Sequence, residues 1–100
     1  MNPFSPTQSV GTLLTEANRH TGASEIAAQV LLSAWNSRDF TVPVENLSLL
    51  DGDNYQHAIN VMNLRYHGRA PQSVIANGDK KFHALWRDWS HLETQRKEAA

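Results

Sequence analysis

Hydrophobic residues recur at helical spacing in four long stretches of the chain, and the most apolar of these runs from Thr21 to Asn36. Ile26 and Leu32 widen its apolar stripe beyond what a surface helix needs. We therefore expect this helix, with Ser24 as its cap, to lie at the centre of the core. The stripe itself consists of Ala27, Val30, Leu31, Ala34 and Trp35.

A first helix is expected before it, from about Pro6 to His20. Ser5 is a suitable N-cap, and proline is favourable at a first helical position, where no backbone N–H is needed. Gly22 is expected to end this helix in a left-handed conformation, so that a short turn joins two antiparallel helices. The predicted buried face consists of Val10, Leu13, Leu14 and Ala17.

A third helix is predicted from about Gly52 to His67, with Asp51 as its N-cap. Val61 and Leu64 lie off its expected apolar stripe, so this helix should contact two neighbours. The stripe predicted to be buried consists of Tyr55, Ala58, Ile59, Met62 and Tyr66.

The last long helix should follow the turn signal Asn77-Gly78, with Asp79 as its cap. Its apolar stripe consists of Phe82, Leu85, Trp86, Trp89 and Leu92. We expect its two tryptophans to meet Trp35 in the core, with ring contacts between them. The alternative is that one of the two is partly exposed and anchors a partner protein, since tryptophan is enriched in binding hot spots.

Three shorter segments connect these helices. Pro43 can start a short helix through Leu50, with Val44 on its apolar side. The irregular stretch before it should return Phe40 to the core. A single helical turn is expected at 74–76.

The pattern therefore predicts an all-α fold, a compact single-domain bundle of four main helices plus short helical turns. The domain should span residues 1–100, with 1–5 and 95–100 expected to fray. A chain of 100 residues with 40% hydrophobic and 19% charged residues is typical of one globular domain. The first eight residues lack the features of a signal peptide, and no stretch approaches the roughly 18 apolar residues of a membrane span. A cytoplasmic protein is expected.

Candidate catalytic and metal-binding residues are sparse. The chain has no cysteine, and its five histidines lack the spacing of a helical zinc pair. Residues 51–54 resemble the start of a calcium loop, but Met62 stands where such a loop needs a glutamate. No serine, histidine and aspartate fall in a recognisable nucleophile frame. We expect a protein that is not an enzyme and that uses no metal or cofactor.

The charge pattern bears on nucleic-acid binding. A net charge of −1 is not the basic excess of a dedicated DNA-binding protein, so direct contact with nucleic acid is not expected. Two small basic clusters, near Arg65 and near Lys80, keep open a second hypothesis. Under it the chain is a small nucleic-acid-associated accessory or regulatory protein of a plasmid or prophage. An ordinary mixed-charge surface explains the same residues.

Several sequence features also carry a family resemblance. The segment T-G-A-S-x-x-A-x-x-x-L-L-x-x-W-N at 21–36, the Leu50-Asp51 step, Pro71 and the block at 85–89 resemble a family of short proteins. Members of this uncharacterised family are carried by proteobacterial plasmids, integrative elements and prophages. The length and the order of elements are also similar to a small helical anti-CRISPR protein of the type I-F group.

This resemblance implies a protein–protein interaction protein of a mobile element that is not an enzyme and acts in a bacterial host. More specifically, it implies an anti-CRISPR inhibitor that binds a type I-F surveillance complex, at its Cas8-type and Cas7-type subunits, and blocks target DNA binding. Lysines line such binding sites, so an inhibitor should present carboxylates. The candidate partner-binding residues are Asp39, Glu45, Asp51 and Asp53. The alternative reading, in which these four are helix caps and solvated loop charges, stays open. No membrane partner is expected.

Overall fold

The computed structural model describes residues 3–93, and this part of the chain is all-α. Its elements, in chain order, are α1 (Pro6–Ala17), α2 (Gly22–Trp35), η1 (Val44–Leu49), α3 (Gly52–Tyr66), η2 (Pro71–Val74), α4 (Gly78–Trp89) and η3 (Ser90–Leu92). The three η elements are short 3-10 helices. The prediction of one domain with four main helices and short helical turns is confirmed.

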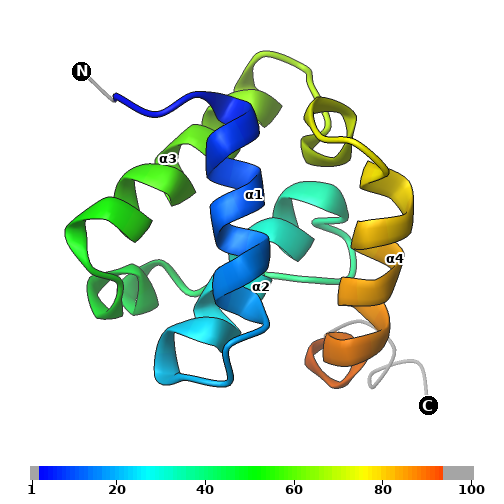
Figure 1. Ribbon diagram of the computed structural model, residues 1–100. Helices are drawn as coiled ribbons and strands as arrows, with labels where there is room; N and C mark the ends of the chain where they lie inside the picture. The colour runs from blue at the N-terminus through cyan, green and yellow to red at the C-terminus, as the bar shows by residue number, and fades with distance from the viewer. Residues whose placement is uncertain (1–2, 94–100) are drawn as a thin grey trace.

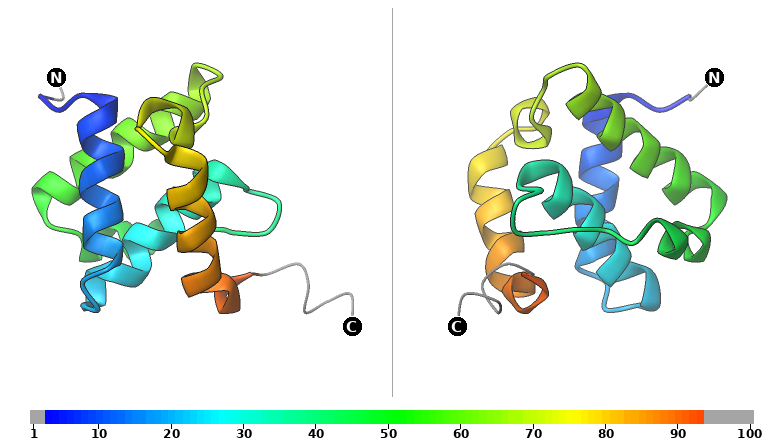
Figure 2. Two further views of the ribbon diagram at one scale, coloured as in Figure 1. Left: turned by 45° about the vertical axis from the view of Figure 1, so that its right-hand side comes forward. Right: turned by 180° about the vertical axis from the view of Figure 1, so that it is seen from behind.

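Helix α2 lies at the centre of the fold, as predicted. Helix α1 crosses in front of it, with α3 on one side and α4 on the other (Figure 1). Helices α1 and α4 run in the same general direction on one face of α2 (Figure 2). Helix α2 packs against each of the other three α-helices. Its buried apolar residues are Ile26, Ala27, Ala28, Val30, Leu31 and Leu32.

The start of α1 agrees with the sequence, but its end does not. The backbone N–H of Gln8 donates to Ser5 Oγ over 3.1 Å, which confirms Ser5 as the N-cap. The helix ends at Ala17, before the predicted His20. His20 itself takes the left-handed conformation, with φ of 58°, whereas Gly22 is the first residue of α2. The left-handed position was therefore predicted at the wrong residue.

Ser24 is not the N-cap residue of α2, which is Thr21, but it lies at the third helical position and forms a capping box with Thr21. The Ser24 hydroxyl accepts from the Thr21 backbone N–H over 2.9 Å and donates to the Glu16 carbonyl over 2.7 Å. This one side chain thus joins the beginning of α2 to the last turn of α1. The contact with α1, which a local pattern does not reveal, fixes α2 to begin at Gly22.

Asp51 caps α3 as predicted, and its Oδ1 accepts from the Asn54 backbone N–H over 2.8 Å. The buried stripe predicted for this helix is confirmed at Ala58 and is wrong at its two tyrosines. Tyr55 and Tyr66 are exposed, by 41% and 84%. The buried face instead consists of His57, Ala58, Asn60, Val61 and Leu64. The two polar members of this face have hydrogen-bond partners on α1, and their burial turns the tyrosines outward.

The predicted start of α4 also needs correction. Its N-cap residue is Asn77, which is left-handed with φ of 56°. Asp79 lies in the first turn, where its negative charge suits the helix N-terminus. The single helical turn that was predicted at 74–76 is instead the 3-10 helix η2, at Pro71–Val74. Among the described residues, Trp35 makes its ring contacts with Phe82 and His83, and no ring contact joins two tryptophans.

The segment between α2 and α3 returns from the α4 side of the molecule to the α3 side, where η1 lies (Figure 1). Phe40 is buried in the core, as predicted. Val44, predicted to face the apolar side of η1, is 78% exposed instead. The segment is therefore anchored in the core by Phe40 just after α2 and by Leu50 just before α3.

Candidate functional site

The structure separates the four carboxylates that were predicted to bind a partner. Asp39 follows α2 and shares a hollow with His83 and Trp86 of α4. The other three lie on η1 and at the start of α3, on the far side of the molecule (Figure 1). The four carboxylates are close in the sequence, which suggested one acidic surface. The segment after Phe40 crosses the molecule, so Asp39 lies apart from the other three.

Three exposed apolar side chains accompany these three carboxylates. We call residues 44–55 the η1–α3 edge. Within it, Val44, Leu49 and Tyr55 are 78%, 68% and 41% exposed. Glu45, Asp51 and Asp53 are exposed in the same segment, which contains no lysine or arginine. The apolar part of this edge was not predicted from the sequence, because periodicity assigned Val44 and Tyr55 to the buried side of their helices.

A buried polar network lies directly behind this edge. The side chains of Ser9 and His57 approach to 2.9 Å between Oγ and Nδ1. Asn60 Nδ2 donates to Ser9 Oγ and to the Phe4 carbonyl, each over 2.9 Å. The Phe4 ring packs on the imidazole with ring centroids 4.1 Å apart. Two residues of the arm that was expected to fray, Phe4 and Ser5, therefore contact the body of the protein. The other residues expected to fray include 1–2 and 95–100, which lie outside the described residues.

This network is suited to a structural role. Ser9 is fully buried, so its hydroxyl is not presented to a substrate. Each hydrogen bond in the network joins α3 to α1 or to the residues before α1, and unpaired polar groups in a core are costly. The network therefore selects which face of α3 is buried.

Burial lowers the pKa of His57 below its ordinary value of 6.5, while the charges of Asp53 and then Asp51 act to raise it. The folded state thus binds this proton less readily than the unfolded chain does. The resulting contribution to stability is present above the ordinary pKa and is lost as the pH falls below it. The two carboxylates of the edge moderate this loss.

Removing these two charges should lower the pKa of His57 further. We expect the variant Asp51→Asn/Asp53→Asn to show this change, because desolvation then acts on the imidazolium with less opposing attraction. Asparagine is also a good N-cap, so α3 should keep its start. An NMR titration of the His57 ring protons would measure the shift. An unchanged or raised pKa would contradict the placement of the two carboxylates near His57.

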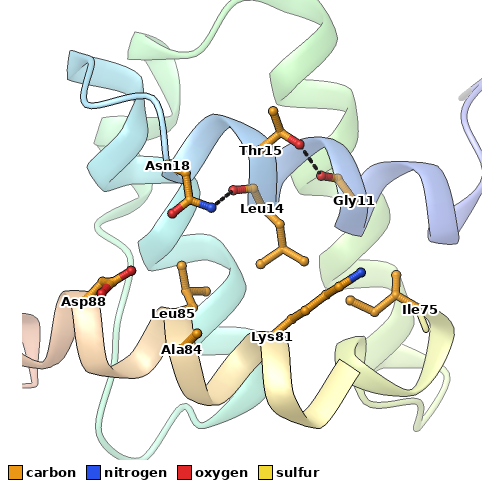
Figure 3. Close-up of a pocket in the computed structure, with 9 residues that line it drawn as sticks. All are labelled: Gly11, Leu14, Thr15, Asn18, Ile75, Lys81, Ala84, Leu85 and Asp88. Atoms are coloured by element: carbon orange, nitrogen blue, oxygen red, sulfur yellow. Dashed lines mark hydrogen bonds between the residues drawn. The ribbon is translucent and has the colours of Figure 1, made fainter. Parts of the chain in front are cut away.

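A groove of about 330 Å³ lies between α1 and α4. Leu14 points from α1 toward Leu85 on α4, and Lys81 extends beside Ile75 (Figure 3). On the α1 side, Thr15 Oγ1 donates to the Gly11 carbonyl and Asn18 Nδ2 donates to the Leu14 carbonyl. The polar side chains of that wall are thus used within α1.

The two basic clusters predicted from the sequence line different hollows. Arg65 lies at an apolar hollow with Val44 and Met62, whereas Lys81 lines the α1–α4 groove. No group of three or more potential metal ligands occurs among the described residues. In residues 3–93, no helix is long and apolar enough to span a membrane.

Comparison with known proteins identifies one family. No curated protein and no solved structure matches the chain. A family model described as "Family of unknown function (DUF7673)" matches residues 7–90, which include α2, α3, α4 and all of α1 except its first residue, Pro6. The match covers most of the chain, and this protein therefore belongs to the DUF7673 family.

Proposed function

We propose that this chain is a protein-binding protein, without catalytic activity, that acts by covering a surface of a larger assembly through its η1–α3 edge. The observation that carries the proposal is the exposure of three large apolar side chains beside three carboxylates in one twelve-residue segment, 44–55. Apolar anchors surrounded by polar groups are the usual composition of a protein interface.

The energetics of the fold support this use of the edge. The core around α2 is closed without Val44, Leu49 or Tyr55. Burying such side chains against a partner gains roughly 25 cal/mol for each Å² of apolar surface. Tyrosine in addition offers a rigid ring and a hydroxyl, which suit it to an anchor position.

The charge of the edge indicates a basic partner. Its carboxylates have no neighbouring lysine or arginine within the segment, so they would repel the phosphates of a nucleic acid. A lysine-lined protein surface would be attracted and oriented by the same charges. A type I-F CRISPR surveillance complex has such a surface where it holds DNA. We propose that complex as the partner, with loss of target DNA binding as the effect.

Binding to a purified type I-F surveillance complex tests this proposal. The wild-type chain is expected to co-purify with the complex and to prevent it from binding target duplex. The variant Glu45→Gln/Asp51→Asn/Asp53→Asn should bind at least tenfold more weakly, because it loses the charges but keeps the α3 cap. Tyr66→Ala is the matched control, since Tyr66 is 84% exposed on the same helix but lies outside the edge.

Three results would count against the proposal. Failure of the wild-type chain to bind the complex would remove this partner. Equal binding by the charge variant would remove the edge as the contact surface. Tight, steeply salt-dependent binding of duplex DNA by the free chain would favour the nucleic-acid accessory hypothesis instead.

A further inference from the structure

We propose that a second site, a hollow between the C-terminal end of α2 and α4, binds an organic ammonium cation. The hollow has a volume of about 250 Å³ and is lined by residues at the end of α2 and on α4. Figure 1 shows η1 and the start of α3 on the opposite side of the molecule from α4. The residues that line it are Trp35, Asn36, Asp39, His83, Trp86 and Glu93. This inference is independent of the proposed function, since it uses none of the residues of the edge.

Two tryptophans supply aromatic surface to the hollow. Trp35 is the last residue of α2, and Trp86 lies on α4 with 37% of its surface exposed. The face of an indole ring attracts cations through its quadrupole, and tryptophan is the strongest of the aromatic side chains in this respect. A partly exposed tryptophan at a hollow is therefore suited to contact a cationic group.

The other charges around the hollow favour the same ligand. Among residues 3–93, the carboxylates of Asp39 and Glu93 line it, and no lysine or arginine of that part of the chain does. The C-terminal end of α2 carries the partial negative charge of the helix dipole, and the last turn of α2 has no basic residue to offset it. Three independent features, the indoles, the carboxylates and the helix end, thus all favour a positive charge.

Hydrogen bonds and packing hold these groups in place. Asn36 Nδ2 donates to Asp39 Oδ2 over 3.1 Å, and the Phe40 backbone N–H donates to the Asn36 carbonyl over 3.1 Å. Trp35 packs against the His83 ring at 5.7 Å between centroids, with the planes at 82°. A pre-organised site loses less entropy when a ligand binds.

The chemistry of the lining favours an alkylated ammonium over a metal ion. Calcium takes six to eight oxygen ligands, and the two carboxylates of the lining supply only a small part of that set. A trimethylammonium group is weakly hydrated and suits indole faces. Pockets for drug-sized ligands span about 300–1,000 Å³, so this smaller hollow fits one head group. The group could belong to a free cation such as choline or to a methylated lysine side chain.

An NMR titration with choline chloride tests the site, with sodium chloride added to matched ionic strength as the blank. We expect the indole N–H signals of Trp35 and Trp86 to shift. The signal of Trp89 should not, because this residue lines a different hollow on the same helix. The neutral isostere 3,3-dimethylbutan-1-ol should bind at least tenfold more weakly, since it has the shape of choline without the charge.

Two variants test the individual contributions. Trp86→Leu should abolish the choline-induced shift of Trp35, while Asp39→Asn should weaken binding at least threefold and keep the bond from Asn36. Thermal unfolding would establish that each variant is folded. The chain carries cations of its own at Arg96 and Lys97, so the titration is repeated with Arg96→Ala/Lys97→Ala, which is expected to bind choline as well.

A short peptide with one trimethyllysine between glycines distinguishes the two sources of the cation. Binding at least tenfold tighter than choline would identify a protein side chain as the ligand, and weaker or equal binding would identify a free cation. The proposal is overturned if choline and its neutral isostere shift the indole signals equally, or if choline shifts neither Trp35 nor Trp86.

Discussion

Replacing Gly78 by alanine is expected to destabilise the protein by about 3 kcal/mol or more, at the upper end of overpacking effects. A Cβ atom at this position would overlap the backbone carbonyl oxygen of Gln72. Backbone atoms cannot rotate away as a flexible side chain does, so η2 and the first turn of α4 would have to separate. Urea unfolding followed by circular dichroism would measure the loss.

The matched control for this substitution is Gly11→Ala, with an effect of opposite sign. Gly11 lies inside α1, and nothing stands within 4 Å of the place where its Cβ would be. Alanine favours the helix by roughly 0.5–1 kcal/mol over glycine, so this variant should be more stable than the wild type. A wild-type stability for Gly78→Ala would contradict the close packing of η2 on α4.

The second large effect is expected for Phe40→Ala, which should cost about 3–5 kcal/mol. A domain of this size has a total stability of about 5–15 kcal/mol, so the loss is a large part of it. Phe40 is buried and is the anchor that follows α2, and its truncation leaves a cavity beside α2 and α3. The free energy of unfolding in urea would show the change.

Val44→Ala serves as the comparison for this variant. Val44 lies four residues further along and is 78% exposed, so its truncation should change the free energy of unfolding by less than about 0.5 kcal/mol. Similar losses for the two variants would contradict the assignment of Phe40 as the anchor and Val44 as a surface residue.

The elements of the fold follow from local signals in the sequence. Ser5-Pro6 and Asp51 were identified as helix starts because capping is a contact within a few residues. The central position of α2 follows from its apolar stripe, which is wider than one face of a helix. Such features need no knowledge of the neighbouring elements.

The errors occur where a distant contact decides the outcome. The buried face of α3 is set by Ser9 of α1, which pairs with His57 and Asn60. Apolar periodicity assigned Tyr66 to the core and gave these polar residues no weight. The end of α1 was likewise placed too late: the helix ends at Ala17, and Ser24 of α2 donates to the Glu16 carbonyl in its last turn, a contact between helices that a local pattern does not show.

The candidate sites were predictable in part. The carboxylates of both candidate sites, except Glu93, were identified from the sequence, and Trp86 was left open as an exposed anchor. It could not show that Asp39 lies beside this tryptophan, because that contact depends on how α4 packs against α2. Val44 and Tyr55 of the η1–α3 edge were assigned to the core by apolar periodicity, as Tyr66 was on α3.

The position of α2 has a consequence for how the molecule melts. Helices α1, α3 and α4 each bury apolar surface against it, and each would lose a large part of its cover if α2 came apart. A subset of helices without α2 therefore has no complete interior of its own. Heating should accordingly produce one all-or-none transition, with the enthalpy measured by calorimetry equal to the van't Hoff value.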